Sequence, residues 1–432
     1  MSSEISDVLE AIETLSARGE RMALATIVSV RGSTYRRPGA RLLVPESGDL
    51  IGNISGGCLE GDVQEVAHKV MGEGGQATLV DFDLTADDEA VWGWGLGCNG
   101  AVELFVEPAE KAADVSGDLR RALEEEREII VVTVLDPAGT EGVERGARLL
   151  VHPDGRRERG LGNPAADDAA TGAALEAFRN GASIKREITV GTSPMVAFVE
   201  VLEPSPRLLI CGAGHDAIPV VRFAAQLGWR PYVIDDRDRF LTSERFPEAA
   251  GFIPLSRPTG AAEATGTDGR TFVLVMSHNY LRDKDYIRSY LGTDVAYIGS
   301  LGPRKRLDSV LTDLQKEGVA ATPEDLAKIY APSGLDIGAE GPEEVAWAIM
   351  AEVIAVRAGR GAGFLRDRRG HIHPRAESPS TPEGGASRSS PGAPSGAGSE
   401  DSTTTDGAAA GPDAQPAPPG PPQRATSRAG AA

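Results

Sequence analysis

One stretch, residues 207–236, constrains the fold more than any other part of this sequence. It begins with the apolar run 208–211, typical of a buried parallel strand, and continues as G-x-G-x-x-A with Gly212 and Gly214 as its glycines. An amphipathic helical run follows, and then a second apolar strand that ends in Asp235. Strand, glycine turn, helix, strand and terminal acid in this order predict a Rossmann-like α/β domain.

The residue types in this stretch favour a nucleotide-type ligand. Gly212 permits a tight turn, Gly214 allows backbone N–H groups to approach a diphosphate, and the helix N-terminus attracts an anion. Asp235 lies 23 positions after Gly212, near the roughly 20 expected for a carboxylate that accepts ribose hydroxyls. The alternative is a glycine turn in an α/β domain that no longer holds a ligand.

The length of 432 residues predicts two or three domains, and the formal net charge of −20 argues against a nucleic-acid partner. Three scattered cysteines (Cys58, Cys98 and Cys211) form no disulfide framework, which favours a reducing compartment. The acidic N-terminus is unlike a signal peptide, and no apolar run is long enough to span a membrane. We therefore expect a cytoplasmic protein.

The first half of the sequence is typical of a mixed α+β domain. We expect a hairpin of 41–44 with 50–54 and a charged helix over 118–128. A stiff link, 203–206, contains two prolines and marks the predicted domain boundary.

After residue 236 the α/β pattern continues. The strand 271–276 ends in a polar stretch that contains His278, and a second glycine turn, 299–306, opens a helix with three cations in its first turn. Cations oppose the dipole at a helix N-terminus, so a bound anion would explain them; the alternative is a solvated basic turn. Residues 370–432 are rich in Pro, Ser, Gly and Ala, and we expect a disordered tail.

Two glycine-rich segments carry cysteines. Ser55-Gly56-Gly57-Cys58 precedes a helical run, where an anion would be favoured and a thiol would have a lowered pKa; the alternative is a capping turn with a small buried cysteine. The segment 92–100 contains Cys98, two tryptophans that could form a wall for a flat ring, and four glycines. The wide spacing of Cys58 and Cys98 argues against a structural zinc site.

At the level of these motifs the chain resembles the xanthine dehydrogenase accessory family (XdhC/CoxI), over roughly residues 1–365. The matching segments are ATIVSVRGSTYRRPGARLLV (25–44), GNISGGCLEGDV (52–63), GLGCNGAVELFVEP (95–108), LLICGAGHDA (208–217), YIGSLGPRKR (297–306) and 331–359. The stretch 277–280 departs from the pattern that many members show.

The resemblance implies an N-terminal XdhC/CoxI-type domain over 1–203 and a Rossmann-like domain over 207–365. It also implies a protein that binds molybdenum cofactor (molybdopterin), keeps its sulfido ligand intact and inserts it into an apo-molybdenum hydroxylase of the xanthine dehydrogenase type. A cysteine desulfurase as a further partner and a homo-oligomer are expected with it. Cys58 and Cys98 are the candidate contacts to molybdenum or sulfur.

Two functions from different classes stay open. The first is a cofactor carrier without turnover of its own, and the second is an NAD(P)-dependent oxidoreductase with His278 as its acid/base. The candidate cofactor-binding residues are Arg36, Arg37, Ser55, Gly56, Gly57, Cys58, Gly97, Cys98, Gly212, Gly214, His215, Asp235, His278, Gly299, Ser300, Gly302 and Arg304.

Overall fold

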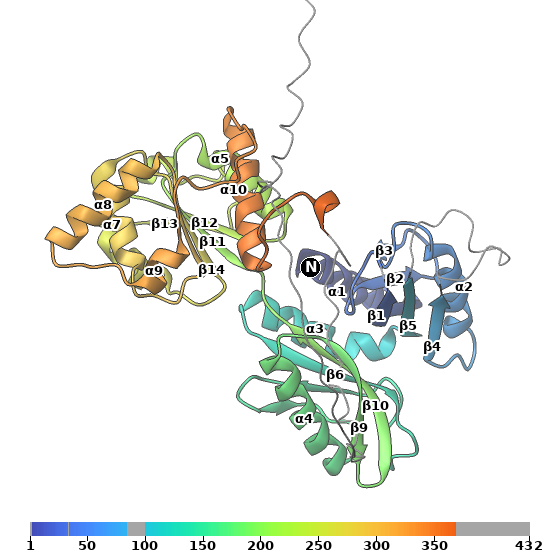
Figure 1. Cartoon of the computed structure of the whole chain (residues 1–432). Helices are drawn as coiled ribbons and strands as arrows, with labels where there is room; N and C mark the ends of the chain where they lie inside the picture. The colour runs from blue at the N-terminus through green and yellow to red at the C-terminus, as the bar shows by residue number, and fades with distance from the viewer. Residues whose placement is uncertain (1, 33, 84–99, 369–432) are drawn as a thin grey trace, which may run out of the picture. The chain divides into compact units, whose positions relative to one another are not determined.

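The structure is a computed structural model that describes residues 2–32, 34–83 and 100–368 (Figure 1). The described residues all fall within one compact unit, Met1–Ala376. The expectations for Gly97, Cys98 and the tail 370–432 lie outside the described residues. Two antiparallel sheets and one parallel sheet make up the fold, so the predicted α/β class is confirmed.

The first antiparallel sheet has the strand order β3-β2-β1-β5-β4. The predicted hairpin is present, with Leu43 opposite Ile51. One face of this sheet packs on α2, whose buried side chains are Val63, Ala67 and Val70. The elements are α1 (Ser2–Ala17), β1 (Met22–Gly32), β2 (Arg41–Pro45), β3 (Ile51–Gly52), α2 (Glu60–Met71), β4 (Thr78–Asp83) and β5 (Gly100–Pro108).

The second antiparallel sheet has the order β8-β7-β6-β10-β9, and α4 packs on it through a stripe of buried alanines. The helix expected over 118–128 instead begins at Glu110 and ends at Glu124. The part that was not predicted, 110–117, buries Ala112, Val115 and Ser116, and only one of these is a large apolar side chain, so the apolar pattern there is weak. The elements are α3 (Glu110–Glu124), β6 (Ile129–Asp136), β7 (Arg148–Val151), β8 (Arg157–Glu158), α4 (Pro164–Arg179), β9 (Ile184–Val190) and β10 (Ser193–Leu202).

These two sheets are copies of one unit. Each copy runs helix, three strands, helix, two strands, and the strand orders match position for position. The register matches too, because Thr26 faces Arg41 as Thr133 faces Arg148. The sequence carries the same signal: Gly-Ala-Arg-Leu-Leu-Val occurs at 39–44 and again at 146–151, and Phe-Val-Glu occurs at 105–107 and 198–200. We call α1–β5 the first copy and α3–β10 the second copy.

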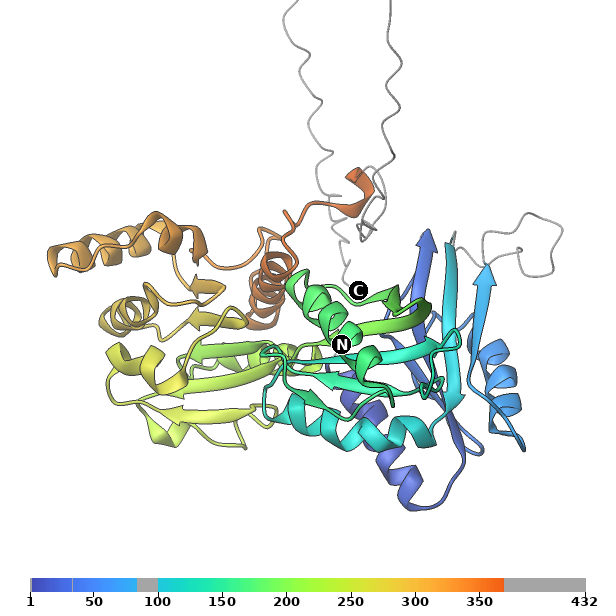
Figure 2. The same ribbon diagram turned by 90° about the horizontal axis from the view of Figure 1, so that it is seen from below.

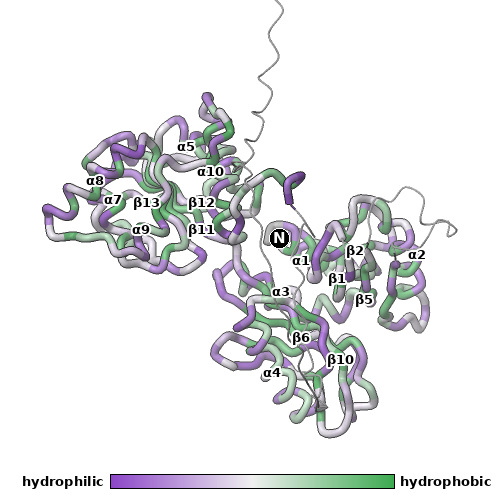
Figure 3. The backbone as a smooth tube through the Cα atoms, in the orientation of Figure 1, coloured by the Kyte–Doolittle hydropathy of each residue, from purple (hydrophilic) through white to green (hydrophobic). Residues whose placement is uncertain are grey.

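The third sheet is fully parallel, with the order β13-β12-β11-β14-β15-β16. In chain order this is 3-2-1-4-5-6, the Rossmann arrangement, in which ligands bind where the order reverses, here between β11 and β14. Figure 2 shows its strands edge-on between helices, and Figure 3 shows the apolar residues along its strands. One core packs α5 and α10 on one face, and a second core packs α7 and α8 on the other.

The elements of this parallel-sheet domain are β11 (Arg207–Cys211), α5 (Ala217–Gln226), β12 (Arg230–Asp235), η1 (Asp238–Phe240), β13 (Gly251–Pro254), η2 (Pro258–Gly260), α6 (Ala261–Thr265), β14 (Thr271–Val275), α7 (Tyr280–Tyr290), β15 (Tyr297–Ser300), α8 (Arg304–Lys316), α9 (Pro323–Lys328), β16 (Ile329–Tyr330), α10 (Pro342–Arg357) and η3 (Leu365–Asp367). Among the described helices, none is long and apolar enough to cross a membrane.

Candidate functional site

The loop before α2 is held together by one serine hydroxyl. Ser55 is buried, and its Oγ accepts hydrogen bonds from the N–H groups of Gly57 and Cys58 at 3.1 Å and of Leu59 at 3.2 Å. The same hydroxyl donates to the carboxylate of Glu60, which also accepts from the N–H groups of Ser55 and Leu59 at 3.1 Å. The expectation that this turn exposes its N–H groups to an anion is therefore wrong for Gly57 and Cys58.

What the loop does present is a thiol. Gly56 and Gly57 are exposed, and a Cβ added to either would meet no atom within 4 Å. Cys58 is half-buried, packs against the first copy's core, and is a free cysteine. The hydrogen bonds of Ser55 and Glu60 to the turn's N–H groups therefore hold the loop by contacts within the chain.

The second copy shows what this position looks like without a cysteine. There, α4 begins after Asn163, whose side chain accepts from the N–H groups of Ala165 at 2.9 Å and Ala166 at 3.2 Å. An ordinary capping residue thus does the structural work that Ser55 and Glu60 do in the first copy. The fold of the unit does not require a cysteine at this turn, so Cys58 is an addition specific to the first copy.

In the basic loop after β1, at least one of the two candidate arginines is already paired within the chain. Arg36 forms an ion pair with Glu4 of α1, and both side chains are half-buried. The neighbouring Arg37 has an exposed side chain.

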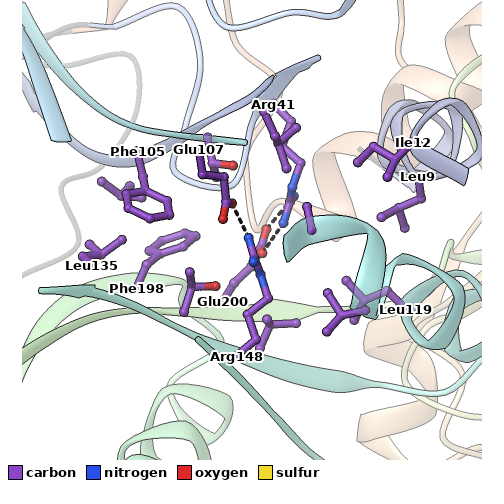
Figure 4. Close-up of a pocket in the computed structure, with 17 residues that line it drawn as sticks. Leu9, Ile12, Arg41, Phe105, Glu107, Leu119, Leu135, Arg148, Phe198 and Glu200 are labelled. Atoms are coloured by element: carbon purple, nitrogen blue, oxygen red, sulfur yellow. Dashed lines mark hydrogen bonds and ion pairs between the residues drawn. The ribbon is translucent and has the colours of Figure 1, made fainter. Parts of the chain in front are cut away.

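Four charged side chains meet in a cavity between the two copies (Figure 4). Arg41 donates to Glu200 at 2.9 Å, and Arg148 pairs with Glu107, so that each arginine reaches a carboxylate of the other copy. All four side chains are at most 10% exposed. The cavity measures about 20 Å³, which is room for roughly one water molecule.

One oxygen in this cavity has no protein partner among the described residues, Oε2 of Glu107. A buried carboxylate oxygen without a donor is costly, and a cavity of this size holds a water that could supply one. We regard the four-residue group as the polar centre of the interface between the copies, because its members occupy equivalent positions in both.

At the carboxyl edge of the parallel sheet, Gly212 and Gly214 do different things. Gly212 has φ +127°, and a Cβ there would lie 2.7 Å from the carbonyl oxygen of Met276, so its close approach to the end of β14 requires glycine. A Cβ on Gly214 would meet only the side-chain end of Asp216 at 2.5 Å. Within the described residues, the N–H groups of Gly214, His215 and Asp216 donate no hydrogen bond, so they can receive an anionic ligand.

Asp235 serves the turn rather than facing solvent. It is 2% exposed and accepts from the N–H of Ala213 at 2.7 Å and from the side chain of Arg237 at 2.7 Å. Burial opposes its ionisation, but the hydrogen bonds from Arg237 and the two backbone N–H groups hold the pKa of Asp235 far below its usual range. A ribose could reach this carboxylate only by displacing Arg237. The next acid, Asp236, is paired with Arg282 at 2.5 Å.

His278 lies at the point where the sheet order reverses. Its side chain is 62% exposed, its Nε2 is 2.7 Å from Oδ2 of Asp216, and its backbone has φ +56°. A non-glycine residue in this region is strained, and such strain is found at binding and catalytic sites. The neighbouring candidate His215 is exposed on the glycine turn. The structure therefore brings His278, Asp216 and the glycine turn together.

The second glycine turn, 299–306, has three cations, of which one is paired with a buried carboxylate and two are exposed. Arg306 pairs with Asp283, a 2%-exposed carboxylate that also accepts from Ser277, so this arginine ties α8 to the loop after β14. Arg304 and Lys305 are exposed.

The glycines and the serine of that turn are shaped by packing. A Cβ on Gly299 would lie 2.5 Å from the hydroxyl of Tyr297, and Gly302 has φ +117°. Ser300 is buried, and its carbonyl accepts from Ser333.

Cys211 is a core residue. It is fully buried at the end of β11, and burial raises the pKa of its thiol far above the usual range. In the part of the chain that the structure describes, no three His, Cys, Asp or Glu side chains are grouped to hold a metal ion.

Comparisons with known proteins agree on one family. Residues 208–353 match the family model described as the XdhC Rossmann domain, and residues 15–83 match the model of the XdhC and CoxI family. The chain is 30% identical over 356 residues to a protein of Bacillus subtilis (strain 168) described as a probable xanthine dehydrogenase subunit, covering 80% of this chain and 96% of that protein.

Two further relatives are informative. The chain is 24% identical over 348 residues to the molybdenum cofactor insertion chaperone PaoD of Escherichia coli (strain K12), covering 80% of this chain and 86% of that protein. A solved structure described as a xanthine dehydrogenase from Bacillus halodurans matches with a TM-score of 0.64 and 28% identity, covering 82% of this chain and 96% of that one.

Proposed function

The chain belongs to the XdhC and CoxI family, and from that membership we propose that it binds molybdenum cofactor and inserts it into a molybdenum hydroxylase of the xanthine dehydrogenase type. The relative PaoD, whose name describes a molybdenum cofactor insertion chaperone, supports this role over most of the chain's length. A cysteine desulfurase as sulfur donor and a homo-oligomeric state belong to the same proposal.

The observation that carries the proposal is the position of Cys58. Two copies of one fold unit differ at this turn: one uses an asparagine cap, and the other has a half-buried thiol directly after two open glycines. A thiolate is a soft ligand, and soft ligands suit molybdenum and sulfur chemistry better than hard oxygen ligands do. Since the fold does not need the cysteine, a ligand-directed role explains it better than packing does.

Different side chains of the protein suit different parts of molybdenum cofactor. The cofactor is a pterin dithiolene that ends in a phosphate, and it brings the molybdenum and its sulfido ligand. The thiol of Cys58 would face the metal or its sulfur. Arg304 and Arg37 are candidate charge partners for the phosphate.

The test is cofactor retention. Purified full-length chain is incubated with free molybdenum cofactor, and pterin and molybdenum are measured per chain after gel filtration. We expect Cys58→Ala to lower both, and Cys98→Ala, in the glycine-rich segment outside the described residues, to lower them most.

Cys211→Ala is the matched control, because it removes a thiol of the buried core. It should change stability more than loading, with circular dichroism as the folding check. Wild-type loading and transfer in both Cys58→Ala and Cys98→Ala would remove thiol chemistry from the proposal.

A second candidate function is favoured by the Asp216–His278 pair. A carboxylate 2.7 Å from an imidazole nitrogen can orient the ring, and a positioned imidazole is the commonest general acid/base in enzymes. Turnover with a dinucleotide, lost in His278→Ala, would support an NAD(P)-dependent oxidoreductase instead of a carrier.

A further inference from the structure

Three guanidinium groups gather on one phenyl ring just after β12. The Cζ atoms of Arg237, Arg239 and Arg245 lie 4.5, 5.0 and 5.0 Å from the centroid of Phe240. Any two of these carbons are therefore at most about 10 Å apart, a separation over which like charges repel at ordinary ionic strength. We call these three residues with Phe240 the arginine cluster.

The cluster is attached to the glycine turn. Arg245 donates to the carbonyl oxygen of Ala213 at 3.2 Å, and Arg237 holds Asp235, which in turn binds the N–H of Ala213. The position directly after the second strand of a Rossmann sheet is where the adenosine ribose of a dinucleotide lies. The guanidinium groups thus stand where a substituent on that ribose would be.

Two of the three arginines keep their charge available. Arg237 is neutralised by Asp235, but Arg239 and Arg245 form no ion pair with any residue that the structure describes. Arg239 is exposed, and Nε of Arg245 is buried without a hydrogen-bond partner. The segment's own acids are Asp236, which pairs with Arg282, and Asp238 and Glu244, both exposed.

Asp235, the acid expected to discriminate against a ribose phosphate, is buried and paired with Arg237. In NAD-binding domains a carboxylate at this point accepts the ribose hydroxyls and repels a 2′-phosphate, whereas an arginine nearby accommodates the phosphate. Here Asp235 is 2% exposed and its charge is balanced by Arg237. Repulsion from Asp235 is removed, and attraction from Arg239 and Arg245 remains.

We propose that the arginine cluster binds the 2′-phosphate of a dinucleotide, so that the parallel-sheet domain selects NADP over NAD. The diphosphate would lie on the unpaired N–H groups of the Gly214 turn, and Arg239 would be the main determinant of the preference. This ligand is separate from the cofactor cargo proposed above, and its binding does not depend on that cargo.

Isothermal titration calorimetry of the full-length chain with NADP⁺ and with NAD⁺, in the absence of any pterin, tests the proposal. We expect NADP⁺ to bind at least about ten-fold more tightly, because charge-assisted hydrogen bonds to a phosphate are strong. Competition with 2′-AMP and 5′-AMP separates a phosphate at the ribose 2′ position from any nucleotide phosphate, and only 2′-AMP should compete well.

Variants then assign the preference to the cluster. Arg239→Ala should weaken NADP⁺ binding about ten-fold and change NAD⁺ binding by less than about two-fold, and Arg239→Glu should reverse the preference. Arg360→Ala, which removes the same charge from the exposed segment after α10, should change neither. Equal affinity for the two dinucleotides, a preference for NAD⁺, no binding of either at millimolar concentration, or an unchanged preference in Arg239→Glu would each overturn the proposal.

Discussion

Asp235 is the residue whose protonation should govern the glycine turn. Its pKa is lowered in the folded chain, so it stabilises the fold above its unfolded pKa of about 3.9, and the stabilisation is lost as the pH falls toward the lowered value. We expect Asp235→Asn to reduce the free energy of unfolding by about 2 kcal/mol at pH 7. The difference from wild type should shrink below pH 4.

Urea unfolding followed by circular dichroism at pH 7, 4 and 3 measures this difference. Asp238→Asn is the matched control, because it neutralises an exposed acid three positions further on. A difference that stays constant between pH 7 and pH 3 would contradict the assigned role.

The two glycines of the turn should respond unequally to a methyl group. In Gly212→Ala the new Cβ would meet main-chain atoms at 2.7 Å, in a backbone conformation that side chains rarely adopt, whereas in Gly214→Ala it meets a movable carboxylate. We expect Gly212→Ala to lower the free energy of unfolding by more than about 2 kcal/mol, and Gly214→Ala by less than about 1 kcal/mol.

Chemical denaturation of both variants decides this, and similar losses would show that the close approach to β14 is not needed. Gly214→Val tests binding separately: it should abolish dinucleotide binding while unfolding stays cooperative. Both glycines can be identified from the spacing of the motif alone. The different tolerance cannot, because it depends on Met276, which lies far along the chain.

At the scale of elements, the buried ion pairs between the copies should be costly to break singly. Arg148→Met leaves Glu107 buried and uncompensated, so we expect a loss of about 3–5 kcal/mol. Adding Glu107→Leu to that variant should restore part of the loss, because no charge is then stranded. Thermal and urea unfolding of the two single variants and the double variant measure the coupling.

The equivalent pair provides the control. Arg41→Met, alone and together with Glu200→Leu, should show the same sign and a similar size, since the two pairs occupy matching positions. Coupling in one pair and none in the other would mean that the copies do not share one polar centre.

Elements can be predicted from the sequence where the apolar pattern is strong. The strands and helices of the parallel-sheet domain follow the expected order, since buried runs such as Thr271–Val275 carry no polar interruption. The start of α3 is not predicted correctly, because its buried face is built partly from alanine and serine. The ion pairs cannot be predicted, because each joins residues more than 40 positions apart.

At the scale of the whole molecule, the tail is expected to be dispensable for folding. Its composition provides too few apolar side chains to bury, so deleting residues 376–432 should leave the melting temperature and ligand affinity nearly unchanged. Differential scanning calorimetry of the shortened chain measures this. A fall of several degrees would show that the tail docks on the rest of the protein.

The duplication is the largest feature that was not predicted, although its signal is present in the sequence. Two identical six-residue segments, 39–44 and 146–151, can be read directly from the printed sequence. Most other equivalent positions have diverged, and a cysteine-bearing turn occurs before the helix of one copy alone. The shared strand order and register show that the two halves are the same unit.

Those identical segments also have a consequence for folding. The strands β2 and β7 carry the same residues and the same local preferences, so an unfolded chain offers each central strand two partners of equal intrinsic affinity. The correct pairing is favoured only by contacts that form later, with neighbouring residues that differ between the copies. Refolding should therefore populate misfolded intermediates in which β2 and β7 have exchanged partners. At high protein concentration the same exchange between two chains should yield domain-swapped dimers.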